Sequence, residues 1–123
     1  MDKDFILRIA QTAREQLLAG TPMQVVMSWG VTDFAAMEFK GMAALRFHVN
    51  GRLFKGYVVI AYNASDYYEV YLLNRDGVTC VHNEVYCDEL GTTIDEAVES
   101  GTDKEEYDRY CEAQLNLLMA GQD

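Results

Sequence analysis

The stretch LRFHVNGRLFKGYVVIAY, residues 45–62, carries the clearest structural signal in the chain. Apolar side chains alternate with polar ones from Leu45 to Asn50, which is the pattern of a half-buried strand. Asn50 and Gly51 follow, a pair favoured in the two-residue type I′ turn because both positions need positive φ. Towards Tyr62 the run becomes apolar on both faces, which indicates a central strand covered by a helix. We therefore predict a β-hairpin that turns at Asn50-Gly51.

Further strands flank this hairpin. Residues 67–74 alternate in the same way, a turn follows at residues 75–77, and residues 78–82 pair back. Residues 23–29 contain the β-branched pair Val25-Val26 and predict a short strand. Residues 30–40 fit either a loop that leads into the sheet or one helical turn.

Helical spacing appears on both sides of the predicted strands. Residues 4–19 keep their apolar side chains on one stripe, and the same period returns over residues 87–101. A capping box at residues 102–105 begins a last helix. We predict one α+β domain over residues 1–123, with an N-terminal helix, an antiparallel β-meander of four to five strands, and one or two C-terminal helices packed on one face.

The charge of the chain is uneven. The net charge is −10, and residues 1–83 hold eight acids and eight bases whereas residues 84–123 hold twelve acids and two bases. Such an acidic end repels phosphate, so we expect no direct binding to nucleic acid. It would attract a basic protein, although an acidic helix face also serves simply to keep a protein soluble.

The N-terminal residues MDKDFILRIAQTAREQ have acids at positions 2 and 4 and regularly spaced polar side chains, which is typical of neither a signal peptide nor a membrane span. The three cysteines have no framework spacing, and reduced thiols are the simplest interpretation. We expect a cytoplasmic protein without membrane contact.

Five segments are distinctive: TAREQLL, VVMSWGVTDF, LRFHVN, YVVIAYNASDYYEVYLLNR and EVYCDEL. In this order they resemble a functionally uncharacterised family of short proteins from bacteriophages and mobile elements of gut bacteria. The resemblance covers roughly residues 12–98 and leaves the acidic last helix outside. It implies a genomic setting and no activity. The turn after the first strand usually carries a lysine in that family, and SWGVTDF has none.

Cys80, His82 and Cys87 are weak candidates for a zinc site, with Cys111 as a fourth ligand. A zinc knuckle would show a CxxC pair, which is absent, so buried or edge positions are the simpler interpretation of these residues, with Cys87 and Cys111 in the core. Cys87 in the first turn of a helix could also act as a nucleophile with His82 as its base. The neighbouring acids oppose this because negative charge raises the pKa of a thiol.

Two surfaces are candidates for binding a partner protein. Tyr67, Glu69 and Tyr71 share one face of a strand and would form an aromatic strip, with Trp29 nearby. The second surface is the acidic C-terminal helix, where clustered carboxylates would imitate nucleic acid in a basic groove. Its residues are Glu99, Asp103, Glu106 and Asp108.

No motif of a catalytic, phosphate-binding or calcium-binding site is present. We therefore expect a non-enzymatic interaction module, without a cofactor, that binds a host or phage protein. An exposed edge strand could also pair with its symmetry mate in a homodimer. The alternatives are the nucleic-acid mimic and a small-ligand domain, metal-binding domain or enzyme with an apolar pocket near Trp29, His82 and Cys87.

Overall fold

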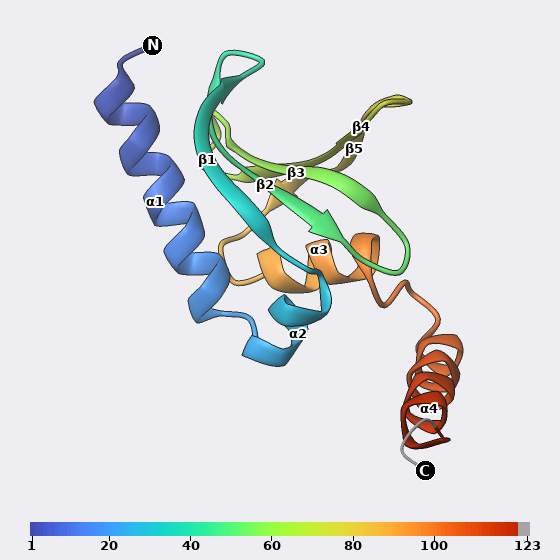
Figure 1. Cartoon of the computed structure of the whole chain (residues 1–123). Helices are drawn as coiled ribbons and strands as arrows, with labels where there is room; N and C mark the ends of the chain where they lie inside the picture. Colours follow the sequence, from blue (N-terminus) through green and yellow to red (C-terminus); the bar gives the residue numbers. More distant parts are fainter. Residues whose placement is uncertain (121–123) are drawn as a thin grey trace.

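A computed structural model describes residues 1–120 of the chain (Figure 1). The helices are α1 (Lys3–Ala19), α2 (Met23–Ser28), α3 (Leu90–Val98) and α4 (Lys104–Ala120). The strands are β1 (Thr32–Phe39), β2 (Met42–Asn50), β3 (Lys55–Tyr62), β4 (Tyr68–Asn74) and β5 (Gly77–Val85).

The five strands form one antiparallel sheet in the order β1-β2-β3-β4-β5, so each strand pairs with its neighbour in the chain. Figure 1 shows α1, α2 and α3 on one side of this curved sheet and no helix on the other. The predicted α+β fold with an antiparallel meander is confirmed. None of the helices in residues 1–120 is long and apolar enough to cross a bilayer.

The main core lies between the sheet and the three helices. Alternation along β2 and β3 directs Phe47, Val58 and Ile60 to this side, where each is fully buried. Helix α1 contributes Ala13 and Leu17, and the alanine lets the helix axis approach the strands closely.

The prediction of a two-residue hairpin turn at Asn50-Gly51 is wrong. Asn50 pairs with Lys55, so residues 51–54 form a longer connection. A Cβ atom at Gly51 would lie 2.4 Å from the backbone oxygen of Val98, so glycine serves here to admit the end of α3. The turn in which both residues have positive φ joins β1 to β2 at Lys40 and Gly41, with φ of 51° and 78°.

The predicted short strand over residues 23–29 is also wrong, because this segment forms α2. The chain turns into a helix directly after Pro22, whose carbonyl accepts the N–H of Val26 at 3.2 Å. Residues 30–40, for which a helical turn or a loop was expected, supply the edge strand β1 instead. The sheet therefore has five strands, although one of them lies at a different place in the sequence.

The C-terminal helices begin later than predicted. Helix α3 starts at Leu90, so Cys87 precedes it. The first turn of α4 is capped by Asp103, whose Oδ1 accepts the N–H of Glu106 at 3.1 Å, one residue after the predicted capping box. Helix α4 then extends away from the rest of the protein (Figure 1).

Candidate functional site

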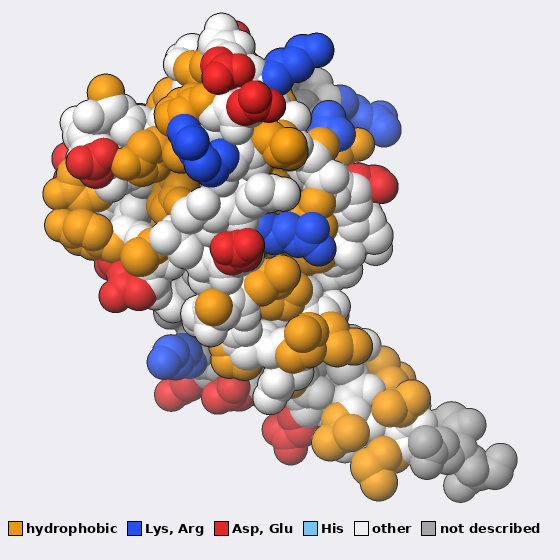
Figure 2. All heavy atoms as spheres, turned by 90° about the vertical axis from the view of Figure 1, so that its left-hand side faces the viewer, with side chains coloured by type: hydrophobic (Ala, Val, Ile, Leu, Met, Phe, Trp, Pro, Cys, Tyr) orange, Lys and Arg blue, Asp and Glu red, His pale blue; other side chains and the backbone are white. Residues whose placement is uncertain are grey.

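Helix α4 carries exposed side chains of a kind that usually pack in a core. The exposed fractions are 55% for Leu115, 68% for Leu117, 63% for Leu118 and 62% for Met119. Figure 2 shows hydrophobic side chains gathered on the part of α4 that extends beyond the body. No other segment described in residues 1–119 exposes four large apolar side chains within five positions.

One stripe of α4 begins against the body and continues past it. Residues spaced by three or four positions share a helix face, and the stripe consists of Tyr107, Tyr110, Cys111, Gln114, Leu117 and Leu118. The rings of Tyr107 and Tyr110 lie 5.3 and 5.1 Å from the guanidinium carbon of Arg52. Leu117 and Leu118 lie two to three turns further on and are open to solvent.

Arg52 anchors the start of α4. Its Nε donates to the carbonyl of Glu99 at 2.9 Å and its Nη2 to that of Ser100 at 3.0 Å, while Nη1 lies 3.2 Å from Oε1 of Glu106. The side chain of Glu99 is buried, and accepts the Arg52 N–H at 2.6 Å and the Tyr107 hydroxyl at 3.3 Å. This network sets the direction in which α4 leaves the body.

Most of the acids predicted to imitate nucleic acid therefore already form hydrogen bonds or ion pairs within the chain. Glu99 and Glu106 bind Arg52, and Asp103 caps α4. Only Asp108 of the four has no hydrogen bond or ion pair among the described residues. Burial, followed by a hydrogen bond with Cys111, raises the pKa of Tyr107.

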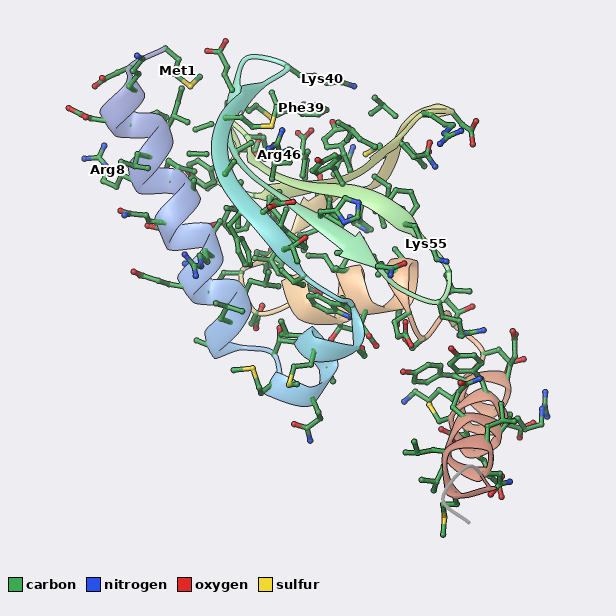
Figure 3. The ribbon with its side chains drawn as sticks, in the orientation of Figure 1. Met1, Arg8, Phe39, Lys40, Arg46 and Lys55 are labelled. Carbon is green, nitrogen blue, oxygen red and sulfur yellow. The ribbon has the colours of Figure 1, made fainter. Side chains whose placement is uncertain are left out.

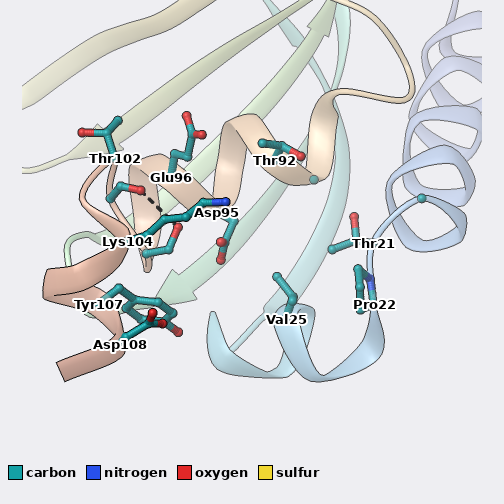
Figure 4. Close-up of a pocket in the computed structure, with 14 residues that line it drawn as sticks. Thr21, Pro22, Val25, Thr92, Asp95, Glu96, Thr102, Lys104, Tyr107 and Asp108 are labelled. Carbon is teal, nitrogen blue, oxygen red and sulfur yellow. Dashed lines mark hydrogen bonds between the residues drawn. The ribbon is translucent and has the colours of Figure 1, made fainter. Parts of the chain in front are cut away.

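A cavity of about 400 Å³ lies beside the start of α4, between α3 and the α1–α2 connection (Figure 4). Asp95, Glu96 and Asp108 make its wall acidic, with Lys104 as a base among the lining residues. Asp95 accepts Nε1–H of Trp29 at 2.9 Å. The Oγ1 atom of Thr21 is buried without a hydrogen-bond partner, but it lies against Gly91, where an added Cβ would approach it to 2.2 Å.

The open face of the sheet, which no helix covers, has a second small apolar cluster. Ala44, Val59, Ala61 and Tyr71 are buried there, packed against side chains from β1, β2 and β4. Figure 3 shows Phe39, Lys40 and Arg46 extending over this face between the two outer hairpins. The Lys40 ammonium lies 4.8 Å from the Tyr71 ring, and the Arg46 guanidinium lies 4.7 Å from the Tyr57 ring.

The predicted aromatic strip lies on this open face but is largely covered. Tyr71 is only 6% exposed, and its hydroxyl donates to Oε1 of Glu69 at 2.6 Å, which raises the pKa of Tyr71. Glu69 also accepts the Asn63 amide at 3.0 Å. Tyr67 packs on Tyr86 with their ring centroids 5.0 Å apart. Tyr86, 55% exposed, is an accessible residue that the sequence pattern did not single out.

The structure does not bring the other candidate residues together. Bulges interrupt β5, so Cys80 lies opposite Tyr71 whereas His82 lies opposite Val70, which faces the other side of the sheet. No group of three metal-ligating side chains occurs in the part of the chain that the structure describes.

The prediction that Cys87 and Cys111 pack in the core is wrong, because both are exposed. Cys87 also lies three residues before the start of α3 and not in the first turn of that helix, as was predicted. Trp29 is fully buried, so it neither contacts a partner nor lines a pocket with the exposed His82 and Cys87.

Comparison with protein-family models, with curated proteins and with solved structures finds no match for this chain. The resemblance to proteins of mobile elements stays a prediction. The structural features that bear on function are therefore α4, its anchor at Arg52 and the open face of the sheet.

Proposed function

We propose that this chain is a protein-interaction module in which α4 is the binding element. The observation that carries the proposal is the exposed apolar surface of Leu115, Leu117, Leu118 and Met119 on a helix that leaves the body. Helices in proteins gain most of their stability from an apolar face that packs on another surface, and the outer half of α4 has no such contact among the described residues. A partner would supply that packing for α4.

The apolar surface is large enough to support binding. Burying one leucine or methionine side chain contributes about 1.5–3 kcal/mol, so four such side chains offer on the order of 6–12 kcal/mol before the costs of association. The four side chains together cover about half of the circumference of the helix at its outer end. A helix typically binds by placing such an apolar side in a groove of its partner.

The charges beside these apolar side chains indicate the chemistry of the groove. Glu105, Asp108 and Glu112 follow one another at helical spacing and form an acidic stripe beside the stripe of Tyr107 to Leu118, and this acidic stripe continues into Leu115 and Met119. A complementary partner would have an apolar groove with basic residues on one rim.

The nucleic-acid mimic receives less support, because Glu99, Asp103 and Glu106 are occupied within the chain. Neutralising them would release α4 from the body as well as remove charge. Glu105, Asp108 and Glu112 are the acids whose neutralisation tests an electrostatic role cleanly.

The test compares two variants of the full chain in affinity capture from the cells that encode it. Leu117→Ser/Leu118→Ser removes the two leucines in which the stripe of α4 ends, and Asn116→Ser makes a serine on a side of the same helix away from that stripe. We expect a captured protein to be lost with the first variant and retained with the second. The captured protein is then purified and titrated against both variants. Equal binding by the two would contradict a role for these leucines.

A further inference from the structure

We infer that the partner of α4 is a second copy of this chain, and that α4 of each copy lies across the open face of the sheet in the other. This inference rests on the proposed function of α4 as a binding element. It joins the two surfaces of the molecule that lack a covering element.

The open face presents an apolar surface on which a helix can lie. Ala44 and Ala61 are paired directly opposite each other on β2 and β3, and both are fully buried because larger side chains cover them. These larger side chains are only half-buried, and they form the outer apolar surface of this face: Met37, Phe39, Met42 and Leu73. A helix that packs on them would bury apolar area that is now partly open to solvent.

The charges on the open face are opposite to those on α4. Lys40 and Arg46 extend over this face. Lys55 and Arg75 line a hollow of about 470 Å³ at its edge, where Asp76 is the single acid among the lining residues. These four bases gather in a chain whose net charge is −10. Glu69 on the same face is held by Tyr71 and Asn63. The acidic stripe of α4, Glu105, Asp108 and Glu112, would therefore meet basic side chains.

The dimensions agree. A helix of 17 residues is about 25 Å long. The outer strands of a five-stranded sheet lie about 19 Å apart, because neighbouring strands are spaced by about 4.8 Å. The first turns of α4 stay on Arg52, so its outer half, about 13 Å long, reaches across about three neighbouring strands.

The contact must form between two copies. Arg52 fixes the first turn of α4 on the helix side of the sheet, and in Figure 1 the helix points away from the open face of its own chain. A reciprocal exchange of α4 between two copies uses each surface once per chain and closes as a two-fold dimer.

The test measures molar mass in solution by light scattering over a range of protein concentrations. We expect wild type and Asn116→Ser to dimerise and Leu117→Ser/Leu118→Ser to stay monomeric. Lys40→Glu/Lys55→Glu, which reverses two exposed charges of the open face, should weaken dimerisation by about tenfold or more. Adding Glu105→Lys/Glu112→Lys to that variant should restore it. Circular dichroism confirms that each variant is folded.

Three outcomes would overturn the inference. A wild-type chain that is monomeric at every concentration excludes the dimer. A dimer that is lost with the α4 variant but indifferent to Lys40→Glu/Lys55→Glu means that α4 pairs with α4. Weakening by those reversals without rescue means that the open face contacts something other than the acidic stripe. In each case the capture experiment still decides separately whether α4 binds a different protein.

Discussion

Helices α1 and α4 are both 17 residues long, yet only α1 packs on the sheet. The buried residues of α1 are Ala10, Ala13 and Leu17, and two small side chains among these three bring the helix close to the strands. The stripe of α4 begins with two tyrosines that contact the side chain of Arg52 and leave the rest of the helix beyond the body. An apolar stripe thus indicates that a helix packs on some surface. Whether that surface belongs to the same chain depends on the side chains with which the helix first meets the body, which are small in α1 and large in α4.

The largest effect is expected from matched leucine substitutions in the two helices. Leu17 is 1% exposed and Leu117 is 68% exposed. Leu17→Ala should lower the free energy of unfolding by about 2–5 kcal/mol because it leaves a cavity in the core. Leu117→Ala should change it by no more than about 0.5 kcal/mol. Urea unfolding at a concentration where the chain is monomeric measures both.

Similar losses for the two variants would contradict the comparison, since they would mean that α4 packs on its own body in solution. Asn116→Ser, on a side of α4 away from Leu117 and Leu118, gives the reference for a surface change in that helix.

The second prediction concerns α3, whose end packs closely against Gly51 in the connection between β2 and β3. Gly51→Ala would place a methyl group 2.4 Å from the backbone oxygen of Val98, and either the loop or the end of α3 must move. We expect a loss of about 3 kcal/mol. Gly41→Ala is the control, because its Cβ would meet nothing within 4 Å, and the cost is only that of its positive φ, about 1 kcal/mol. Thermal unfolding of the two variants side by side distinguishes them, and equal losses would mean that α3 does not approach Gly51.

The third prediction removes the anchor of α4. Arg52→Met keeps much of the side-chain stem but loses the guanidinium that binds Glu99, Ser100 and Glu106. We expect a loss of about 2 kcal/mol, because Glu99 stays buried with fewer partners. Hydrogen exchange in the first turns of α4 should become faster, while α1 should keep its protection. Arg75→Met at the exposed β4–β5 turn is the control, and unchanged exchange in α4 would mean that the anchor does not hold the helix.

The sheet could be predicted because its signal is local. Alternation over β2 and β4 determines which side chains face the core, whatever the connections between the strands are. The predicted meander is therefore confirmed although the prediction of the turn at Asn50-Gly51 is wrong. The same pair of residues fits a hairpin turn or a close contact with a distant helix. Only the position of Val98, far along the chain, decides between them.

The candidate site could not be predicted for the same reason. Arg52 reaches Glu99 and Glu106 across 47 and 54 residues of sequence, and no local pattern reports such a contact. The acidic residues near the C-terminus were recognised as a group, but which of them are occupied depends on this one arginine. Val25 and Val26 favour a strand by local preference, and packing of α2 beside Trp29 overrides that preference.

The smallest effect is expected at the contact that ties α1 to the sheet. Tyr68 is 7% exposed, and its hydroxyl donates to Oε1 of Gln16 in α1 at 2.6 Å. Burial raises the pKa of Tyr68 to about 12. Because the folded state favours the neutral phenol, this stabilisation is complete below about pH 10, the ordinary pKa of tyrosine, and is lost as the pH rises towards 12.

Tyr68→Phe should therefore cost about 1 kcal/mol at neutral pH, through the lost hydrogen bond, and the difference from wild type should shrink between about pH 10 and pH 12. Urea unfolding over that pH range measures it. If the difference in the free energy of unfolding between Tyr68→Phe and wild type stays constant over that pH range, the Tyr68 hydroxyl reaches solvent and α1 is less firmly docked than the structure shows. Tyr107→Phe makes the same measurement for α4, because burial against the body also raises the pKa of Tyr107. A pH-dependent difference for both variants would show that α4 is held at its first turn as α1 is held along its length, so that only the outer half of α4 is free to bind.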